Sequence, residues 1–109
     1  MDPDKINKLL KGVKSRQYRV HSGEDVRIEL PTIPMTAETE FIELRTQSEG
    51  DDCMQETLTE AEEGTSRKEI AGKASKVGKR KYTIKAFDVL TQKEIEGVEQ
   101  LEIEIEVIE

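Results

Sequence analysis

Two stretches near the C-terminus alternate strictly between apolar and charged residues. In residues 101–107, Leu, Ile or Val stands at every odd position and Glu at every even one. Side chains in a strand point to opposite faces with a period of two, so this pattern predicts a strand with one aliphatic and one acidic face. Residues 79–90 predict a second strand, in which Tyr82, Ile84 and Ala86 face inward.

The outer faces of these two predicted strands are complementary in charge. If the strands pair as an antiparallel hairpin, Lys81 and Lys85 lie across from the glutamates of residues 101–107. Each such pair contributes about 0.2–1 kcal/mol, and a slip of one residue would bury glutamates, so we expect the charges to define the register. The apolar phase changes at Phe87 and Val89, which predicts either a bulge near residues 86–88 or a strand that passes from one environment to another.

The remaining chain predicts a short helix and further short strands. Asp2 and Pro3 suit the N-cap and the first helical position, and apolar residues then recur at helical spacing, so residues 1–15 are predicted as an amphipathic helix. Strands are expected at residues 16–20, 26–30, 41–46, 53–58 and 69–77. The last of these is expected at a sheet edge because its side chains are small. Residues 16–109 are therefore predicted as one mostly β domain, an immunoglobulin-like antiparallel β-sandwich of about seven strands.

Composition limits the function more than the fold. Leu, Ile, Val and Phe make up 26 of the 109 residues, which exceeds the roughly 20% below which disorder is expected. The net charge of −7 at pH 7 argues against nucleic-acid binding, which needs a basic surface. No apolar run approaches the roughly 18 residues of a membrane span.

The N-terminus and the cysteine content bear on location. Residues 1–4 are acidic where a signal peptide has a basic region, and no apolar stretch follows, so we expect no secretory signal. The single cysteine, Cys53, excludes an internal disulfide, which fits a reducing compartment. We therefore expect a cytoplasmic protein, or a domain excised from a larger one.

Candidate catalytic and metal-binding groups are few. His21, the only histidine, lies in a polar turn, and Cys53 suits a small buried hydrophobe, so we expect no catalytic residue and no enzymatic activity. An acidic cluster offers oxygen ligands for Ca²⁺, although its spacing differs from that of an EF-hand; it comprises Glu49, Asp51, Asp52 and Glu56. A solvated acidic loop is the favoured alternative, and no metal or cofactor is predicted.

The layout of the chain resembles that of the chagasin-type cysteine-protease inhibitors. A strand ends at Leu30 and Pro31, a proline-containing loop follows, and a later glycine turn leads into the sequence Lys-Tyr-Thr-Ile-Lys-Ala at residues 81–86. The resemblance implies binding to a papain-type protease. Residues 32–36 read Thr-Ile-Pro-Met-Thr where that family has Asn-Pro-Thr-Thr-Gly, and no Arg-Pro-Trp follows, so the inhibitory residues are not carried over.

Together these patterns predict a non-enzymatic module that acts by protein–protein contact or as an accessory structural domain. The candidate contact surfaces are the loop of residues 32–40, the acidic loop of residues 49–63 and the edge at residues 69–77. The individual candidates are Thr32, Ile33, Pro34, Met35, Glu49, Asp51 and Asp52. The alternatives are self-association of copies through an edge strand, with acidic and basic segments pairing between copies, and a protease-inhibitor-like binder.

Overall fold

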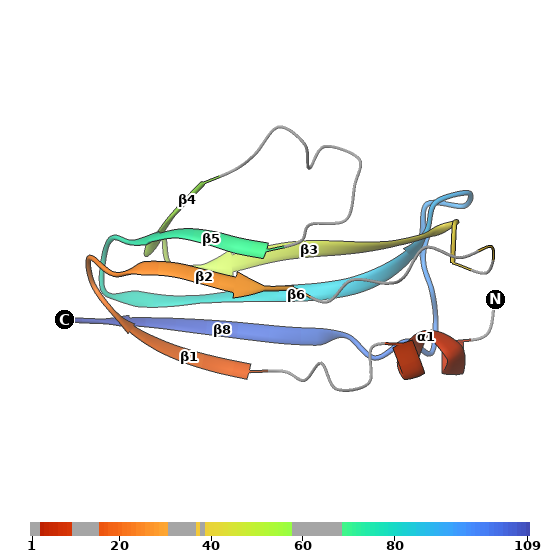
Figure 1. The fold of residues 1–109 in the computed structure, drawn as a ribbon, viewed down its shortest axis with the longest axis horizontal. Coiled ribbons are helices and arrows are strands. Elements are labelled where there is room, and N and C mark those ends of the chain that lie inside the picture. The colour runs from red at the N-terminus through yellow and green to blue at the C-terminus, as the bar shows by residue number, and fades with distance from the viewer. Residues whose placement is uncertain (1–2, 10–15, 31–36, 38, 58–68) are drawn as a thin grey trace.

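The computed structural model describes residues 3–9, 16–30, 37, 39–57 and 69–109 (Figure 1). These residues form one short helix and eight strands, so the chain is mostly β as predicted. The elements are α1 (Pro3–Leu9), β1 (Arg16–His21), β2 (Asp25–Glu29), β3 (Ile42–Gly50), β4 (Met54–Glu56), β5 (Glu69–Ala74), β6 (Gly78–Asp88), β7 (Lys93–Glu94) and β8 (Leu101–Ile108).

The strands form the two layers of a β-sandwich (Figure 1). One sheet has the order β1-β8-β6-β3, with the two-residue β7 beside β6, and the other has the order β2-β5-β4. All pairs are antiparallel except β1 with β8, which is parallel, so the first sheet is mixed.

One hydrophobic core fills the space between the two sheets. In β8 every odd position from Leu101 to Val107 is buried, and every even position is more exposed, as the alternation predicts. The opposite sheet contributes apolar side chains to the same cluster. The core includes Val26, Ile28, Leu44, Cys53, Met54, Ile70, Ala74, Tyr82, Ile84, Ala86, Leu101, Ile103, Ile105 and Val107.

The pairing of β6 with β8 confirms the predicted antiparallel hairpin. Lys81 lies opposite Glu104, and its Nζ is 3.5 Å from Oε1 of Glu102 on the outer face. The prediction for Lys85 is wrong, because the pairing with β8 ends at Ile84 and Lys85 lies beyond it. Its Nζ is instead 3.7 Å from Oε1 of Glu94, on β7.

The bulge predicted near residues 86–88 is also wrong. β6 pairs with β3 without interruption from Arg80 to Asp88. Phe87 stays on the outer face, where the guanidinium carbon of Arg45 lies 4.4 Å from its ring centroid. This cation–π contact stabilises an aromatic ring outside the core, so the change of apolar phase needs no extra residue in the strand.

The small residues near 69–77 do not mark a sheet edge, so that prediction is wrong. β5 lies in the middle of its sheet, between β2 and β4. A Cβ atom at Gly72 would collide with the backbone oxygen of Gln55 on β4. Glycine is needed here because two backbones approach closely, and β5 offers no open edge for association.

The helix α1 closes one end of the sandwich, near the start of β8 (Figure 1). Ile6 is buried in the core. The side-chain amide of Asn7 donates to the carbonyl oxygen of Gly97 at 2.9 Å, and its oxygen accepts from the backbone N–H of Glu99 at 2.9 Å. The helix begins at Pro3, as its residue type suggests. Residues 10–15 lie outside the described part, and the division at residue 15 stays a prediction.

Truncation of Ile105 tests the position of the core. Ile105 is fully buried, so Ile105→Ala is expected to lower the free energy of unfolding by about 2–5 kcal/mol. Urea denaturation measures this change. Val77 is 57% exposed, and the control Val77→Ala is expected to change stability by no more than about 0.5 kcal/mol. Equal losses in the two variants would contradict the described core.

Candidate functional site

Two pairs of strands end in the same direction along the sandwich. Ile42, the first residue of β3, pairs with Asp88, the last of β6, and Glu29, the last of β2, pairs with Glu69, the first of β5. In Figure 1 the end of β6 and the start of β3 lie at the right, whereas β2 ends and β5 begins nearer the middle of the molecule. We call the end formed by β3 and β6 the distal end.

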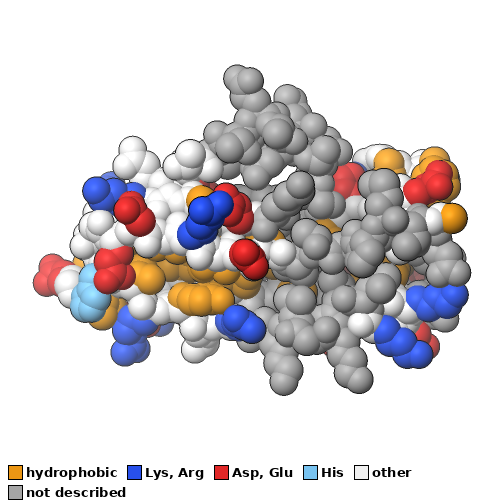
Figure 2. Space-filling view, viewed as in Figure 1, with side chains coloured by type: hydrophobic (Ala, Val, Ile, Leu, Met, Phe, Trp, Pro, Cys, Tyr) orange, Lys and Arg blue, Asp and Glu red, His pale blue; other side chains and the backbone are white. Residues whose placement is uncertain are grey.

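Three exposed apolar side chains gather at the distal end. Phe41, Val89 and Leu90 have 42%, 38% and 70% of their surface exposed. The backbone N–H of Val89 donates to the carbonyl oxygen of Phe41 at 2.9 Å, so the two segments adjoin. Figure 2 shows hydrophobic side chains gathered at this end of the molecule. We call Phe41, Val89 and Leu90 the apolar tip.

The remaining exposed large hydrophobic residue of the described part lies elsewhere. Val77 is in the turn between β5 and β6, at the end opposite the distal end. Singly exposed apolar residues are common on soluble proteins, whereas exposed apolar residues that cluster often mark an interaction site. The apolar tip is therefore the stronger candidate, and Val77 is a natural control for it.

The turn that carries Val89 and Leu90 is held by backbone and side-chain hydrogen bonds. Asp88 Oδ1 accepts from the N–H of Leu90 at 2.8 Å and of Thr91 at 3.4 Å. The carbonyl oxygen of Asp88 accepts from the N–H of Gln92 at 2.8 Å. The Gln92 amide donates to the carbonyl oxygen of Val89 at 2.6 Å. These contacts define the turn without any burial of Leu90.

Arg45 connects this turn to β3. Its Nη2 donates to Oε1 of Gln92 at 2.6 Å, while its guanidinium lies over the ring of Phe87. Nη2 is also 3.6 Å from Oε2 of Glu43. A planar guanidinium can stack on a ring and donate within its plane at the same time. Arg45 therefore links β3, β6 and the turn through one side chain.

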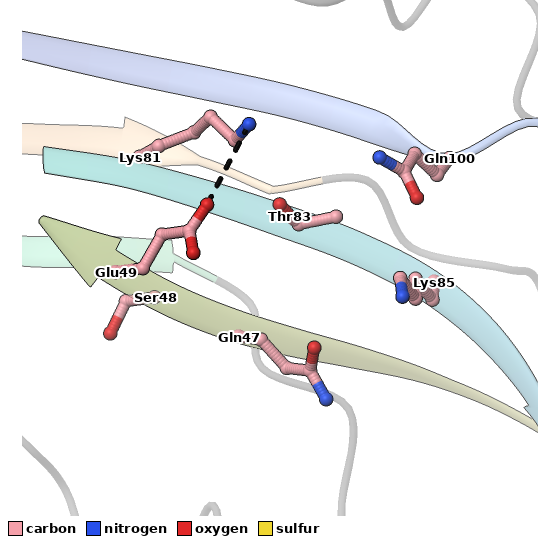
Figure 3. Close-up of a pocket in the computed structure, with 7 residues that line it drawn as sticks. All are labelled: Gln47, Ser48, Glu49, Lys81, Thr83, Lys85 and Gln100. Carbon is pink, nitrogen blue, oxygen red and sulfur yellow. Dashed lines mark ion pairs between the residues drawn. The ribbon is translucent and has the colours of Figure 1, made fainter.

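A shallow polar hollow lies on the outer face of the five-stranded sheet (Figure 3). Glu49 points toward Lys81 across it, with Oε1 and Nζ 3.7 Å apart. Lys81 also pairs with Glu102, so its charge is balanced by two carboxylates of the chain itself. The hollow is lined by Gln47, Ser48, Glu49, Lys81, Thr83, Lys85 and Gln100. This arrangement is typical of a solvated charged face, and we assign it no ligand.

The other sheet carries a similar exposed ion pair. Arg27 Nε donates to Oε2 of Glu69 at 2.8 Å, and this hydrogen bond is the main reason that the pKa of Arg27 is raised. In the first sheet, Nη2 of Arg19 on β1 lies 3.5 Å from Oε2 of Glu106 on β8. Exposed pairs of this kind contribute little to stability. They show that many charges of both outer faces are balanced within the chain.

The acidic candidate residues lie at the end opposite the apolar tip. Glu49 is near the end of β3, and Asp51 and Asp52 follow it in the connection to β4. Asp51 Oδ2 accepts from the backbone N–H of Lys79 at 2.9 Å, and the Asp51 N–H donates to the carbonyl oxygen of Lys79 at 2.8 Å. Both aspartates are exposed, but the contacts of Asp51 hold the connection against β6. The other candidates, Thr32, Ile33, Pro34 and Met35, lie outside the described residues.

Arg80 reinforces the same connection. Its Nη1 donates to the carbonyl oxygens of Gly50 at 3.4 Å and Asp51 at 3.2 Å, and its Nη2 donates to Oγ of Ser48 at 2.8 Å. Gly50 has φ of 113°, which favours glycine, and a Cβ there would meet the backbone of Lys79. These contacts give this acidic turn a structural role.

Cys53 and His21 occupy different environments. Cys53 is fully buried, as predicted, and burial raises the pKa of its thiol. His21 is exposed at the end of β1, where its Nδ1 lies 2.9 Å from the carbonyl oxygen of Glu109. Within the described ranges, no group of three or more His, Cys, Asp and Glu side chains is arranged to hold a metal ion.

No protein-family model matches the chain, and no curated protein matches it. In the part that the structure describes, no helix is both long and apolar enough to cross a membrane.

The alternation pattern does not predict the apolar tip. It predicts a strand as far as Leu90, whereas β6 ends at Asp88 and Val89 begins a turn. Asp88 itself carried the available signal, because Asp side chains accept hydrogen bonds from backbone N–H groups two residues later and thereby favour turns. The hydrogen bond from Arg45 to Gln92 could not be predicted from the sequence around either residue, because the two are 47 positions apart.

The two aspartates after β3 test the structural role of the acidic turn. Asp51→Ala removes the carboxylate that accepts from Lys79 N–H, so we expect the free energy of unfolding to fall by about 1 kcal/mol. Asp52→Ala is the matched control, with an expected change within about 0.5 kcal/mol. Urea denaturation of both variants provides the comparison. A larger loss for Asp52→Ala than for Asp51→Ala would refute this assignment.

The reactivity of Cys53 tests its burial. Because the thiol is buried and its pKa is raised, little thiolate is present or accessible near neutral pH. We expect a thiol reagent such as 5,5′-dithiobis(2-nitrobenzoate) to react with the native protein at least about 100-fold more slowly than with the urea-unfolded chain. Equal rates in the two states would place Cys53 at the surface instead.

Proposed function

We propose that this chain is a non-enzymatic β-sandwich module that binds another protein through the apolar tip. The observation that carries the proposal is the joint exposure of Phe41, Val89 and Leu90 on one end of the sandwich. Apolar clusters left in contact with water are unfavourable, and on soluble proteins they often serve as contact sites. A few such anchors supply most of the binding energy in typical interfaces.

The order of the turn supports this proposal. Leu90 is 70% exposed, yet its own N–H and those of two neighbouring residues are engaged by hydrogen bonds within the turn or to Phe41. A side chain presented by an ordered turn loses less conformational entropy on binding than one on a flexible segment. The turn is thus suited to bind rather than only to connect two strands.

The extent of the tip suggests that neighbouring residues complete the interface. Three side chains expose far less than the roughly 800 Å² that each partner buries in a standard interface. The predicted contact loop of residues 32–40 ends immediately before Phe41 in the sequence, which places Thr32, Ile33, Pro34 and Met35 among the candidates for such contacts. Glu40 and Lys93 are exposed close to the tip in sequence.

Self-association through an edge strand is the less favoured alternative. Its charge pairing between copies would compete with pairs that already exist within the chain, such as Lys81 with Glu102 and Arg19 with Glu106. The segment expected at an edge, residues 69–77, forms the central strand β5 for most of its length. Sedimentation distinguishes the alternative, because self-association predicts a mass that rises with concentration and falls with salt.

A matched pair of variants tests the proposed function. The purified chain, Leu90→Asp and Val77→Asp are immobilised and exposed to lysate of the source organism at low and moderate salt. We expect the same protein to be retained by the unmodified chain and by Val77→Asp at both salts, and retention to fall at least about tenfold for Leu90→Asp, as loss of a hot-spot anchor implies. Circular dichroism and urea denaturation first establish that both variants are folded.

Two outcomes would contradict this function. Equal retention by Leu90→Asp and Val77→Asp would show that binding occurs away from the tip, and retention that disappears at moderate salt would indicate a charged interface. An assay of papain-type protease activity in the presence of the purified chain distinguishes a protease-inhibitor-like binder from a module that binds other proteins.

A further inference from the structure

We infer that Arg45 and Gln92 are positioning residues that hold the apolar tip in one conformation. The tip then forms a rigid knob, an ordered apolar projection that enters a preformed apolar pocket on a different, folded protein. This inference rests on the proposed function, which it deepens by naming the class of partner and the residues that prepare the tip. Neither residue belongs to the tip, so each is argued to act through the turn that carries Leu90.

The backbone of Gln92 is the first observation. Its φ of 60° lies in the left-handed region, which residues with a side chain seldom occupy. Such conformations persist where surrounding contacts determine them, and they cluster at functional segments. Here the side-chain amide of Gln92 makes two contacts, donating to the Val89 carbonyl oxygen and accepting from Arg45 Nη2, both at 2.6 Å.

The position of Arg45 is the second observation. One guanidinium stacks on Phe87, donates to Gln92 and lies near Glu43, so its orientation is determined from three sides. Phe87 belongs to β6 and Glu43 to β3, the two strands that run into the distal end. Arg45 and Gln92, which we call the brace, therefore connect the turn to the sheet and restrict the motion of the turn.

The brace has no evident role in the packing of the core. The residues that it orients, Val89 and Leu90, are among the most exposed large apolar residues of the described part. A polar turn of the same length would connect β6 to β7 without exposing apolar surface. An ordered turn that exposes Leu90 to solvent is instead suited to binding. Because the turn already has the conformation of the complex, it loses little conformational entropy when it binds.

The surface of a second copy of this chain offers a poor binding site for the rigid knob. The hollow on one sheet face is lined mainly by charged and amide side chains, including Lys81, Lys85 and Gln100, and the hollow on the other face contains the ion pair of Arg27 and Glu69. Insertion of Leu90 there would remove polar groups from water without compensation. An apolar pocket on a different folded protein is the partner surface that fits.

Amide hydrogen exchange of the free protein tests the brace without any partner. Arg45→Lys keeps the charge but loses the planar group that stacks and donates, and Gln92→Gly accepts the left-handed backbone but loses the amide. We expect the N–H groups of Leu90 and Gln92 to exchange at least about tenfold faster in both variants, because the turn opens more often. Exchange in the centre of β8 should not change.

Arg19→Lys is the matched control, because Arg19 lies on the same sheet and makes an exposed pair with Glu106. We expect its turn exchange to equal that of the unmodified chain. Unchanged exchange of Leu90 and Gln92 in both Arg45→Lys and Gln92→Gly would overturn the positioning role. An equal increase in Arg19→Lys would also overturn it, because the effect would not be specific to the brace.

Binding to the captured partner separates this inference from the proposed function. If the tip acts as a rigid knob, Arg45→Lys weakens binding about tenfold while Arg19→Lys does not. Normal binding by Arg45→Lys together with lost binding by Leu90→Asp would retain the docking site and reject the brace. Faster turn exchange in Arg45→Lys together with full binding by Leu90→Asp would retain the brace and reject docking at the tip.

Discussion

The antiparallel pairing of β6 with β8 is the contact on which the rest of the structure depends. Its inner face buries Tyr82 and Ile105 completely, and its outer face carries lysines opposite glutamates. A slip of one residue would move three glutamates into the core, where an unpaired carboxylate costs several kcal/mol. Because β1 pairs with β8 and β3 pairs with β6, this register also determines the position of both outer strands.

The apolar tip is an extension of this pairing. β6 separates from β8 after Ile84 but stays paired with β3 as far as Asp88, so the two strands continue together to the distal end. Arg45 then covers Phe87 on the outer face and reaches Gln92. The turn is therefore fixed to a sheet that is itself fixed by the core, and the binding that we propose at the tip would not require a loose segment to become ordered.

The fold was predictable where the signal was local, and the site was not. Period-two alternation in residues 101–107 specifies a strand whatever surrounds it, and its burial follows the pattern throughout. Phe87 was misread because its outward position depends on Arg45, which is distant in sequence. Gly72 was misread because a small residue suits both an open edge and a close approach of two backbones. Likewise, no pattern in the acidic stretch reveals that Asp51 engages Lys79.

Site-specific photo-crosslinking in cells of the source organism would identify the surface through which the chain binds its partner. A photoreactive residue is placed in turn at Leu90 on the tip, Thr83 on the outer sheet face and Val77 at the opposite end, three positions that sample separate surfaces of the same folded chain. The account predicts a discrete crosslinked protein from position 90 alone. A crosslink from position 83 or 77, with none from position 90, would contradict it and place the binding surface elsewhere.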